Sequence, residues 1–274
     1  MNKLTLLISI LLCLAVNQIN GQEKKTNCKI KNTTFQSGEK LSYTISYNWL
    51  VVFSEVGLVE FTIKNDMING KEAYHFKAAG QTFSWWDKFF KVRDSYETWV
   101  LKDNLRPQYF QRNTREGDYR QHENYTFQGD TIVYRKNKIK DNPFNYDTIK
   151  IDGCSYDVMS ALLYTRNLDF TKYKINDKIP VTVVLDDKPY DLYFRYLGIE
   201  NKKIKDLGTF ECLKFTVLLV EGTMFKEGED MFLWVTNDAN RIPVYVESPI
   251  LIGSVKGYIT KIEGNRYPLS SLKK

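Results

Sequence analysis

The sequence is poor in the residues that most often hold metals. It has only two histidines, His75 and His122, which lie far apart, and it has no Cys-x-x-Cys pair. Structural zinc sites need closely spaced cysteine and histidine ligands. The sequence therefore predicts no metal site.

Familiar catalytic motifs are also missing. The chain has no Gly-x-Ser-x-Gly elbow, no phosphate-binding loop, no dinucleotide fingerprint and no His-Glu-x-x-His motif. We expect no cofactor and assign no catalytic residue. The sequence favours a non-enzymatic protein over an enzyme.

Long apolar runs are confined to the start of the chain. Lys3 is followed by a mostly apolar run over residues 4–16 and by small or polar residues up to Gly21. This run is shorter than the roughly 20 residues of a membrane-spanning helix, so it predicts a secretory signal peptide over residues 1–21 rather than an anchor. Leu12 precedes Cys13 where lipid attachment needs a small residue. We expect residues 22–274 to form a single β-rich exported domain, soluble in the periplasm or outside the cell, or associated with an outer membrane.

Excess charge and cysteine are both limited. The formal net charge is +6, and lysine clusters such as residues 135–140 are short, which argues against a nucleic-acid partner. Without the signal peptide, Cys28, Cys154 and Cys212 remain. Any of three pairings is open, and one thiol must stay free or pair between chains.

Alternating polarity is abundant by contrast. Residues 38–50 place an apolar set on one side of a strand, with serine, threonine and asparagine on the other. The apolar set is Leu41, Tyr43, Ile45, Tyr47 and Trp49. This face covers either a packed core or a ligand cavity.

Similar segments recur along the chain. Residues 56–65 and 72–80 flank an Asn-Gly turn and form the clearest hairpin. Further strands are predicted over residues 90–100, 105–112, 119–128, 131–135, 179–185, 190–198, 210–220, 231–235, 242–248 and 252–262. Residues 155–168 instead predict one amphipathic helix, with Ser155 as N-cap, Asp157 in the first turn and Arg166 near the end.

These elements together predict a mostly β fold. Short connections favour antiparallel neighbours, and about 12 strands cannot stay in one flat sheet because strand twist makes large sheets curl or close. We expect a curved antiparallel sheet, or an incomplete or broad β-barrel, with one central amphipathic helix. Such an interior is often wide enough for a ligand.

Aromatic residues crowd one loop, residues 81–94. Phe83, Trp85, Trp86, Phe89 and Phe90 follow neither strand nor helix spacing. One interpretation is a hydrophobic lip for an apolar ligand, a membrane surface or a partner. The other is that these side chains plug one end of a barrel or cover a sheet.

Charged residues offer a weaker signal. Asp157 and Arg166 on the helix, with Asp94, Glu97, Asp238 and Arg241 at strand ends or turns, are candidates for a cleft with acids and bases. Ion pairs that tie the helix to the sheet explain such residues equally well.

Several blocks of sequence together resemble one family. They are FQSGEKLSYTISYNWL, VRDSYETWV, LRPQYF, DVMSALLYTR, LGTFECLKF, LWVTNDANRIPVYVES and IGSVKGYI. Their order over residues 35–262 resembles the exported bacterial domain-of-unknown-function family 3108 (DUF3108). The resemblance implies a secreted β-rich protein without assigned activity, similar in shape to open antiparallel barrels that carry lipoproteins and lipids. It places the following residues at recognisable family positions: Asp157, Ser160, Tyr164, Arg166, Trp234, Asp238, Arg241 and Pro243.

From these patterns we expect an envelope protein that binds a lipid-like ligand or a protein partner in its curved sheet, with peripheral membrane contact as a further expectation. The alternatives are a hydrolase-like enzyme with an Asp157–Arg166 cleft and a structural component of envelope assembly. The predicted ligand-binding residues are Trp85, Trp86, Phe89, Phe90, Asp157, Arg166, Trp234, Asp238 and Arg241.

Overall fold

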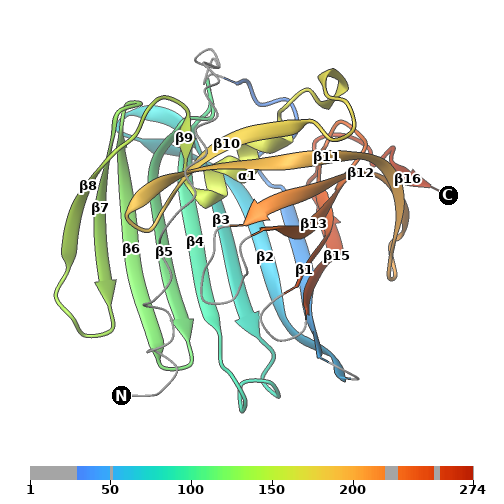
Figure 1. Cartoon of the computed structure of the whole chain (residues 1–274), viewed down its shortest axis with the longest axis horizontal. Helices are drawn as coiled ribbons and strands as arrows, with labels where there is room; N and C mark the ends of the chain where they lie inside the picture. Colours follow the sequence, from blue (N-terminus) through green and yellow to red (C-terminus); the bar gives the residue numbers. More distant parts are fainter. Residues whose placement is uncertain (1–29, 50–51, 220–227, 250–253, 274) are drawn as a thin grey trace, which may run out of the picture.

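Alternating apolar side chains form strands along most of the chain in the computed structural model. The structure describes residues 30–49, 52–219, 228–249 and 254–273. Figure 1 shows a large curved sheet with one short helix on its inner side. The predicted mostly β class and the single helix are confirmed.

The first half of the chain forms eight strands. They are β1 (Lys40–Trp49), β2 (Val52–Ile68), β3 (Lys71–Thr82), β4 (Arg93–Leu101), β5 (Pro107–Glu116), β6 (Tyr119–Gln128), β7 (Ile132–Ile139) and β8 (Asn145–Lys150). Next come β9 (Ser155–Tyr156), α1 (Val158–Arg166) and a short 3-10 helix, η1 (Phe170–Lys172). The rest comprises β10 (Lys178–Leu185), β11 (Lys188–Ile204), β12 (Gly208–Leu219), β13 (Gly228–Thr236), β14 (Pro243–Pro249), β15 (Ser254–Glu263) and β16 (Leu272–Lys273).

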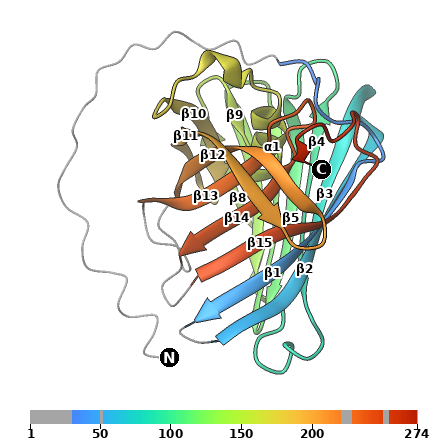
Figure 2. The ribbon, with the colours of Figure 1, turned by 90° about the vertical axis from the view of Figure 1, so that its right-hand side faces the viewer.

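All these strands belong to one sheet. Its order is β8-β7-β6-β5-β4-β3-β2-β1-β15-β14-β13-β12-β11-β10-β9, and β16 pairs with β12. Every pair is antiparallel except β9 with β10. The β1–β15 ladder joins the two halves, as Figure 2 shows, with Lys40 opposite Glu263 and Ile45 opposite Gly257.

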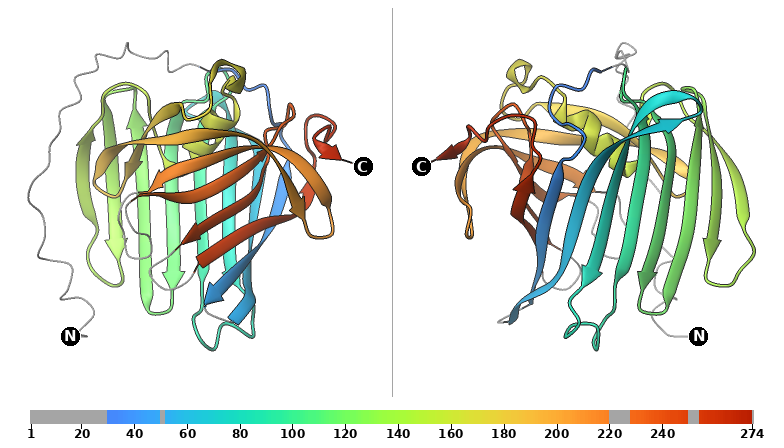
Figure 3. Two further views of the ribbon diagram at one scale, coloured as in Figure 1. Left: turned by 45° about the vertical axis from the view of Figure 1, so that its right-hand side comes forward. Right: turned by 180° about the vertical axis from the view of Figure 1, so that it is seen from behind.

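The sheet rolls up without closing. β8 and β9 are its two ends in the strand order, and in Figures 1 and 3 the β10–β11 hairpin crosses the inner side of the first half. Side chains of β5 and β6 contact this hairpin. Arg112 of β5 forms an ion pair with Asp186 in the hairpin turn, and the Tyr125 hydroxyl of β6 lies 3.1 Å from the Asp186 carbonyl oxygen. The incomplete barrel among the expected shapes is the one observed.

The helix begins later than predicted. Its N-cap is Asp157, whose Oδ1 accepts hydrogen bonds from the backbone N–H groups of Met159 and Ser160, both at 2.9 Å. The prediction of Ser155 as N-cap is wrong because Ser155 and Tyr156 pair with β10 instead. Arg166 does lie in the last turn.

Strand boundaries also differ from expectation. β2 and β11 are each 17 residues long and extend beyond their predicted ranges. β8 was not predicted because only Ile149 is buried among its six residues, so the strand has almost no apolar alternation. Hydrogen bonding to β7 forms it.

Cysteine pairing is partly visible. Cys154 is disulfide-bonded, whereas Cys212 is a buried free thiol, so the partner of Cys154 lies outside the described residues, as Cys28 does. Burial raises the pKa of the Cys212 thiol to about 12, which keeps it protonated. No helix in the described part of the chain is long and apolar enough to cross a membrane.

Candidate functional site

The apolar face of β1 points into the interior of the rolled sheet. Leu41 and Tyr43 are buried, and both line, with Ile45, a cavity of about 530 Å3. The prediction that this face turns inward is confirmed for these three residues. The side chain of Trp49 lies outside the described set.

Both halves of the sheet and α1 form the cavity wall. Val59 and Phe61 of β2 line it from the first half, and Leu233 and Val235 of β13 line it from the second. Further lining residues come from strands β10 to β12 and from the helix: Val183, Leu192, Phe194, Phe215, Ala161 and Leu162. Nearly all of this surface is hydrocarbon. An apolar solute gains free energy here by leaving water, whereas a charged group would lose its hydration without compensation.

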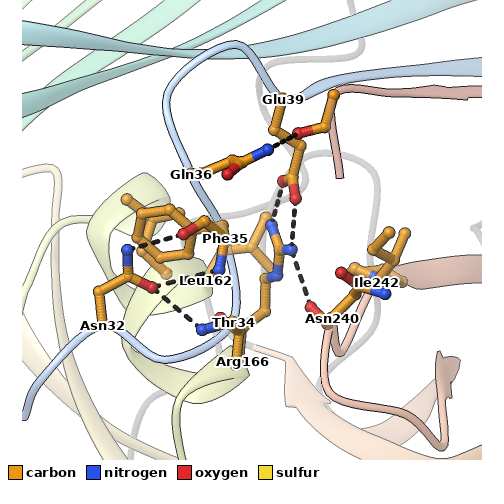
Figure 4. A network of polar contacts seen from close by, with 12 residues as sticks. Asn32, Thr34, Phe35, Gln36, Glu39, Leu162, Arg166, Asn240 and Ile242 are labelled. Carbon is orange, nitrogen blue, oxygen red and sulfur yellow. Dashed lines mark hydrogen bonds and ion pairs between the residues drawn. The ribbon is translucent and has the colours of Figure 1, made fainter. Parts of the chain in front are cut away.

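Arg166 is the one charged residue among the described residues that line the cavity. Its Nη1 and Nη2 donate to Glu39 Oε1 and Oε2 at 2.6 and 2.9 Å, and Nη2 also donates to the Asn240 carbonyl oxygen at 2.9 Å. Figure 4 shows this network beside Phe35, whose ring centroid lies 5.5 Å from the guanidinium carbon. Arg166 Nε is buried without a hydrogen-bond partner in the described part of the protein.

The loop that follows β13 holds Asn240 in place. Asp238 Oδ1 accepts hydrogen bonds from the Thr236 hydroxyl at 2.9 Å and from the Asn240 N–H at 3.0 Å. Its Oδ2 accepts one from the Ser271 hydroxyl at 2.7 Å. Asp238 therefore positions this loop and is not among the cavity-lining residues.

Arg241 occupies a strained position beside η1. It has a positive φ of 51°, and its guanidinium carbon lies 5.3 Å from the centroid of the Phe170 ring, which lines the cavity. Burial lowers the pKa of Arg241. Its Nη1 is buried without a hydrogen-bond partner among the described residues.

The Asp157 carboxylate accepts four hydrogen bonds at the start of α1. Besides the two N–H groups, its Oδ2 accepts hydrogen bonds from the hydroxyls of Thr98 at 2.8 Å and Ser160 at 2.7 Å. Burial raises the pKa of this carboxyl group. Asp157 and Arg166 lie at opposite ends of α1, and only Arg166 lines the cavity, so the structure does not bring this pair together.

Trp234 lies on the other face of β13. Its neighbours Leu233 and Val235 line the cavity, and successive strand residues face opposite sides. Trp234 is buried among residues such as Cys212 and Ile242, with the Lys202 ammonium 3.9 Å from its ring centroid.

The aromatic loop, residues 83–92 between β3 and β4, is largely exposed. Phe89 is 76% exposed, Trp85 and Phe90 are each 49% exposed, and Trp86 is partly buried. The interpretation that these side chains plug the barrel does not fit this exposure. None of them is among the cavity-lining residues.

The acids of β4 have separate environments. Glu97 forms ion pairs with His75 at 2.8 Å and Lys77 at 3.3 Å on neighbouring β3, which fits the ion-pair interpretation. Asp94 accepts a hydrogen bond from the Arg115 N–H at 2.8 Å. Burial, together with the negative charge of Glu116, raises the pKa of Asp94 to about 6.

A buried charge cluster was not predicted from the sequence. Glu123 of β6 is wholly buried and lies 2.7 Å from Arg112 Nε and 2.6 Å from Arg135 Nε. The same cluster borders a second cavity of about 180 Å3. The three side chains of the charge cluster come from β5, β6 and β7. No local sequence motif indicates that they lie in contact. Glu39, which pairs with Arg166, was missed for the same reason.

No metal centre is indicated by side-chain placement. Within the described residues, no group of three or more histidine, cysteine, aspartate or glutamate side chains is arranged to hold a metal ion. Polar chemistry at the cavity is limited to Arg166 and a few hydroxyls such as those of Tyr43 and Thr165. The Tyr43 hydroxyl is already used, because it donates to the Pro243 carbonyl oxygen at 2.7 Å.

A solved structure shares this architecture. It is the "Beta-barrel-like Protein of Domain of Unknown Function DUF1849 from Brucella abortus", with a TM-score of 0.54 and 8% sequence identity. The similarity covers 84% of this chain and 98% of that one. At this identity the likeness concerns the fold alone.

Sequence comparison identifies a family. No curated protein matches the sequence. The family model described as "Protein of unknown function (DUF3108)" matches residues 42–260, which is most of the chain. The blocks that resembled this family lie in or around that range, and the chain belongs to the DUF3108 family.

Proposed function

We propose that this protein binds an apolar or amphipathic, lipid-like ligand inside the rolled sheet. The observation that carries the proposal is the cavity of about 530 Å3 with its almost continuous hydrocarbon wall. This volume is typical of small-molecule sites, which lie in the range of about 300–1,000 Å3.

Burial of hydrocarbon would drive the binding. Each methylene group moved from water into an apolar site contributes about 0.8 kcal/mol. Aromatic side chains add contact area: Phe61 comes from the first half of the sheet, and Phe194 and Phe215 contact each other in the second half. An extended alkyl chain therefore fits this wall better than a sugar, a nucleotide or a peptide does.

Arg166 favours a ligand with one polar atom. Glu39 already balances the guanidinium charge, so the site does not call for a second anion. The buried Nε lacks an acceptor among the residues that the structure describes, and burying an unpaired donor costs free energy. A neutral ligand oxygen, such as a carbonyl or hydroxyl oxygen, would accept this hydrogen bond.

A cavity-filling variant tests the proposal. Leu233→Trp adds bulk inside the cavity, and Ile199→Trp makes the same change at a site on β11 that is 60% exposed. We expect the wild-type protein and Ile199→Trp to bind N-dansyl-undecylamine, a neutral probe with an alkyl chain and sulfonyl oxygens, with equal affinity, and Leu233→Trp to bind it at least tenfold more weakly. Fluorescence titration measures the affinities, and thermal melting checks that the variants fold. Absence of saturable binding by the wild-type protein would refute the proposal.

We also propose that the protein works outside the cytoplasm. The disulfide at Cys154 supports this location, because such bonds persist in oxidising compartments. The apolar run over residues 4–16 fits an export signal. Cell fractionation followed by thiol labelling tests the proposal: an exported protein should resist labelling at Cys154 until it is reduced, whereas a reduced cytoplasmic pool would contradict it.

A further inference from the structure

The aromatic loop lies at the end of the sheet where β1 ends and β2 begins. In Figures 1 and 2, the β3–β4 connection is at the lower edge, near the lower ends of β1 and β2. Hydrogen bonding confirms this neighbourhood, because the Phe83 N–H donates to the Val56 carbonyl oxygen at 3.0 Å. Helix α1 lies toward the other edge of the sheet in Figure 1.

Aromatic contacts connect the end of β1 to the loop. Ile45 lines the cavity, and Tyr47 follows two residues later in a stretch of β1 that pairs regularly with β15. The ring centroid of Tyr47 lies 6.4 Å from that of Trp86. Trp86 in turn contacts Trp85 and Phe89 at centroid distances of 5.4 and 5.6 Å. Aromatic contacts therefore run from Tyr47, two residues beyond the cavity-lining Ile45, to the exposed tip of the loop.

The loop is held in shape by its own polar contacts. Asp87 Oδ2 accepts a hydrogen bond from Arg93 Nη2 at 2.6 Å, and Asp87 Oδ1 accepts one from the Thr82 hydroxyl. Backbone turns add hydrogen bonds from Trp86 N–H to the Phe83 carbonyl oxygen at 2.9 Å and from Phe89 N–H to the Trp86 carbonyl oxygen at 2.8 Å. The aromatic side chains are thus presented to water on an ordered support, so docking requires little further ordering of the backbone.

Charge on the loop is positive at its surface. Lys88 and Lys91 are exposed next to the aromatic residues, while the one acidic residue of the loop, Asp87, is paired with Arg93. Aromatic rings prefer the interface between lipid headgroups and hydrocarbon, and lysine is attracted to anionic headgroups. Both preferences are met on one short loop.

We propose that the aromatic loop docks on a lipid bilayer that carries anionic headgroups, at the end of the sheet where β1 ends and β2 begins. Trp85, Phe89 and Phe90 insert at the headgroup level, and the two lysines contact the lipid phosphates. A stable protein–protein interface buries about 800 Å2 on each partner, more than the three exposed aromatic side chains of one short loop offer. A bilayer needs only a few inserted side chains.

Vesicle co-sedimentation tests the docking. The probes are vesicles of phosphatidylcholine and vesicles with a quarter of phosphatidylglycerol. We expect the wild-type protein to bind the anionic vesicles, and Trp85→Ser/Phe89→Ser to bind them at least tenfold more weakly. The control variant Tyr146→Ser/Ile199→Ser removes two exposed apolar side chains elsewhere, 68% and 60% exposed, and should bind like the wild type.

A variant of Lys88 and Lys91 tests the electrostatic part of the proposal. Lys88→Gln/Lys91→Gln should lose most of the preference for anionic over neutral vesicles, and high salt should have the same effect on the wild type. Failure of the wild-type protein to bind anionic vesicles, or unchanged binding by the Trp85→Ser/Phe89→Ser variant, would overturn the proposal.

Binding of the loop to vesicles and binding of a ligand in the cavity can be measured separately. The loop variants should bind N-dansyl-undecylamine with wild-type affinity and melt at the wild-type temperature. If they lose this affinity without any loss of vesicle binding, the loop belongs to the ligand site and the docking proposal is wrong. Loss of vesicle binding alone supports docking whatever occupies the cavity.

Discussion

Arg166 shows how one side chain can combine several roles. Its place in the last turn of α1 was predicted, but its partner Glu39 lies 127 positions earlier in the chain. Sequence spacing favours a helix-dipole interaction for such a residue. The structure instead gives it a buried ion pair that ties the helix to the residues just before β1, and it also places Arg166 among the residues that line the cavity.

Removal of the guanidinium should destabilise the protein strongly. Arg166→Met leaves Glu39 buried without its partner, and we expect the free energy of unfolding to fall by about 3–5 kcal/mol. Urea unfolding followed by circular dichroism measures the change. The double variant Arg166→Met/Glu39→Leu removes both charges and should recover most of the loss; if it is less stable than the single variant, the two residues do not act as a pair.

Asp94 should give the protein a pH-dependent stability. Its pKa of about 6 in the folded protein exceeds the unfolded value of 3.8, so the folded protein holds this proton more tightly. The stability that Asp94 contributes is therefore fully present below pH 3.8 and is lost as the pH rises through 6.

A neutral analogue removes this dependence. Asp94→Asn keeps an oxygen for the Arg115 N–H and should be more stable than the wild type by about 1 kcal/mol at pH 8. At pH 4 the two proteins should be nearly equal. Melting temperatures across this range provide the measurement, and a constant offset at every pH would argue against titration of Asp94.

At the scale of elements, sequence periodicity was sufficient wherever one strand face is apolar. β1 and β6 were placed within a few residues because their buried positions alternate. β8 and β9 were not predicted, because they form strands by pairing with β7 and β10 and not through an alternating pattern of their own. The helix was found from its apolar spacing, but its start depends on whether Ser155 joins β10, which local sequence does not specify.

The start of α1 should depend on Asp157. Asp157→Ala removes acceptors for two backbone N–H groups and two hydroxyls, all buried, and we expect a loss of about 2 kcal/mol or more in the free energy of unfolding. Asp169→Ala is the matched control, since Asp169 caps η1 in an exposed position. Chemical denaturation should show a much smaller loss for this control. Equal losses would mean that burial of the cap adds nothing.

At the scale of the whole molecule, the curved sheet and its apolar interior followed from strand number and alternation. The cavity was foreseen as one of two outcomes for the face of Leu41 and Tyr43. The polar contacts were not foreseen, because Glu39, Glu123 and Asp186 meet their arginines across strands or across the rolled sheet. Such ion pairs depend on how the sheet curls.

The Glu123 cluster should be essential to this curled form. Glu123→Ala leaves Arg112 and Arg135 without their shared carboxylate, and we expect a loss of about 3–5 kcal/mol. Glu72→Ala, at an exposed ion pair with Lys102, should cost less than about 1 kcal/mol. Equilibrium unfolding in urea compares the two variants, and similar values for both would contradict a structural role for the buried cluster.

The open roll has a consequence for what the protein can enclose. In a closed barrel, strand number and stagger set the diameter, because hydrogen bonds run around the full circumference. Here that circuit is interrupted between β8 and β9, and side chains such as Arg112 hold the overlap. A change in diameter by sliding of this overlap would leave every ladder intact, so under the proposed ligand binding one cavity wall would accommodate ligands of different bulk.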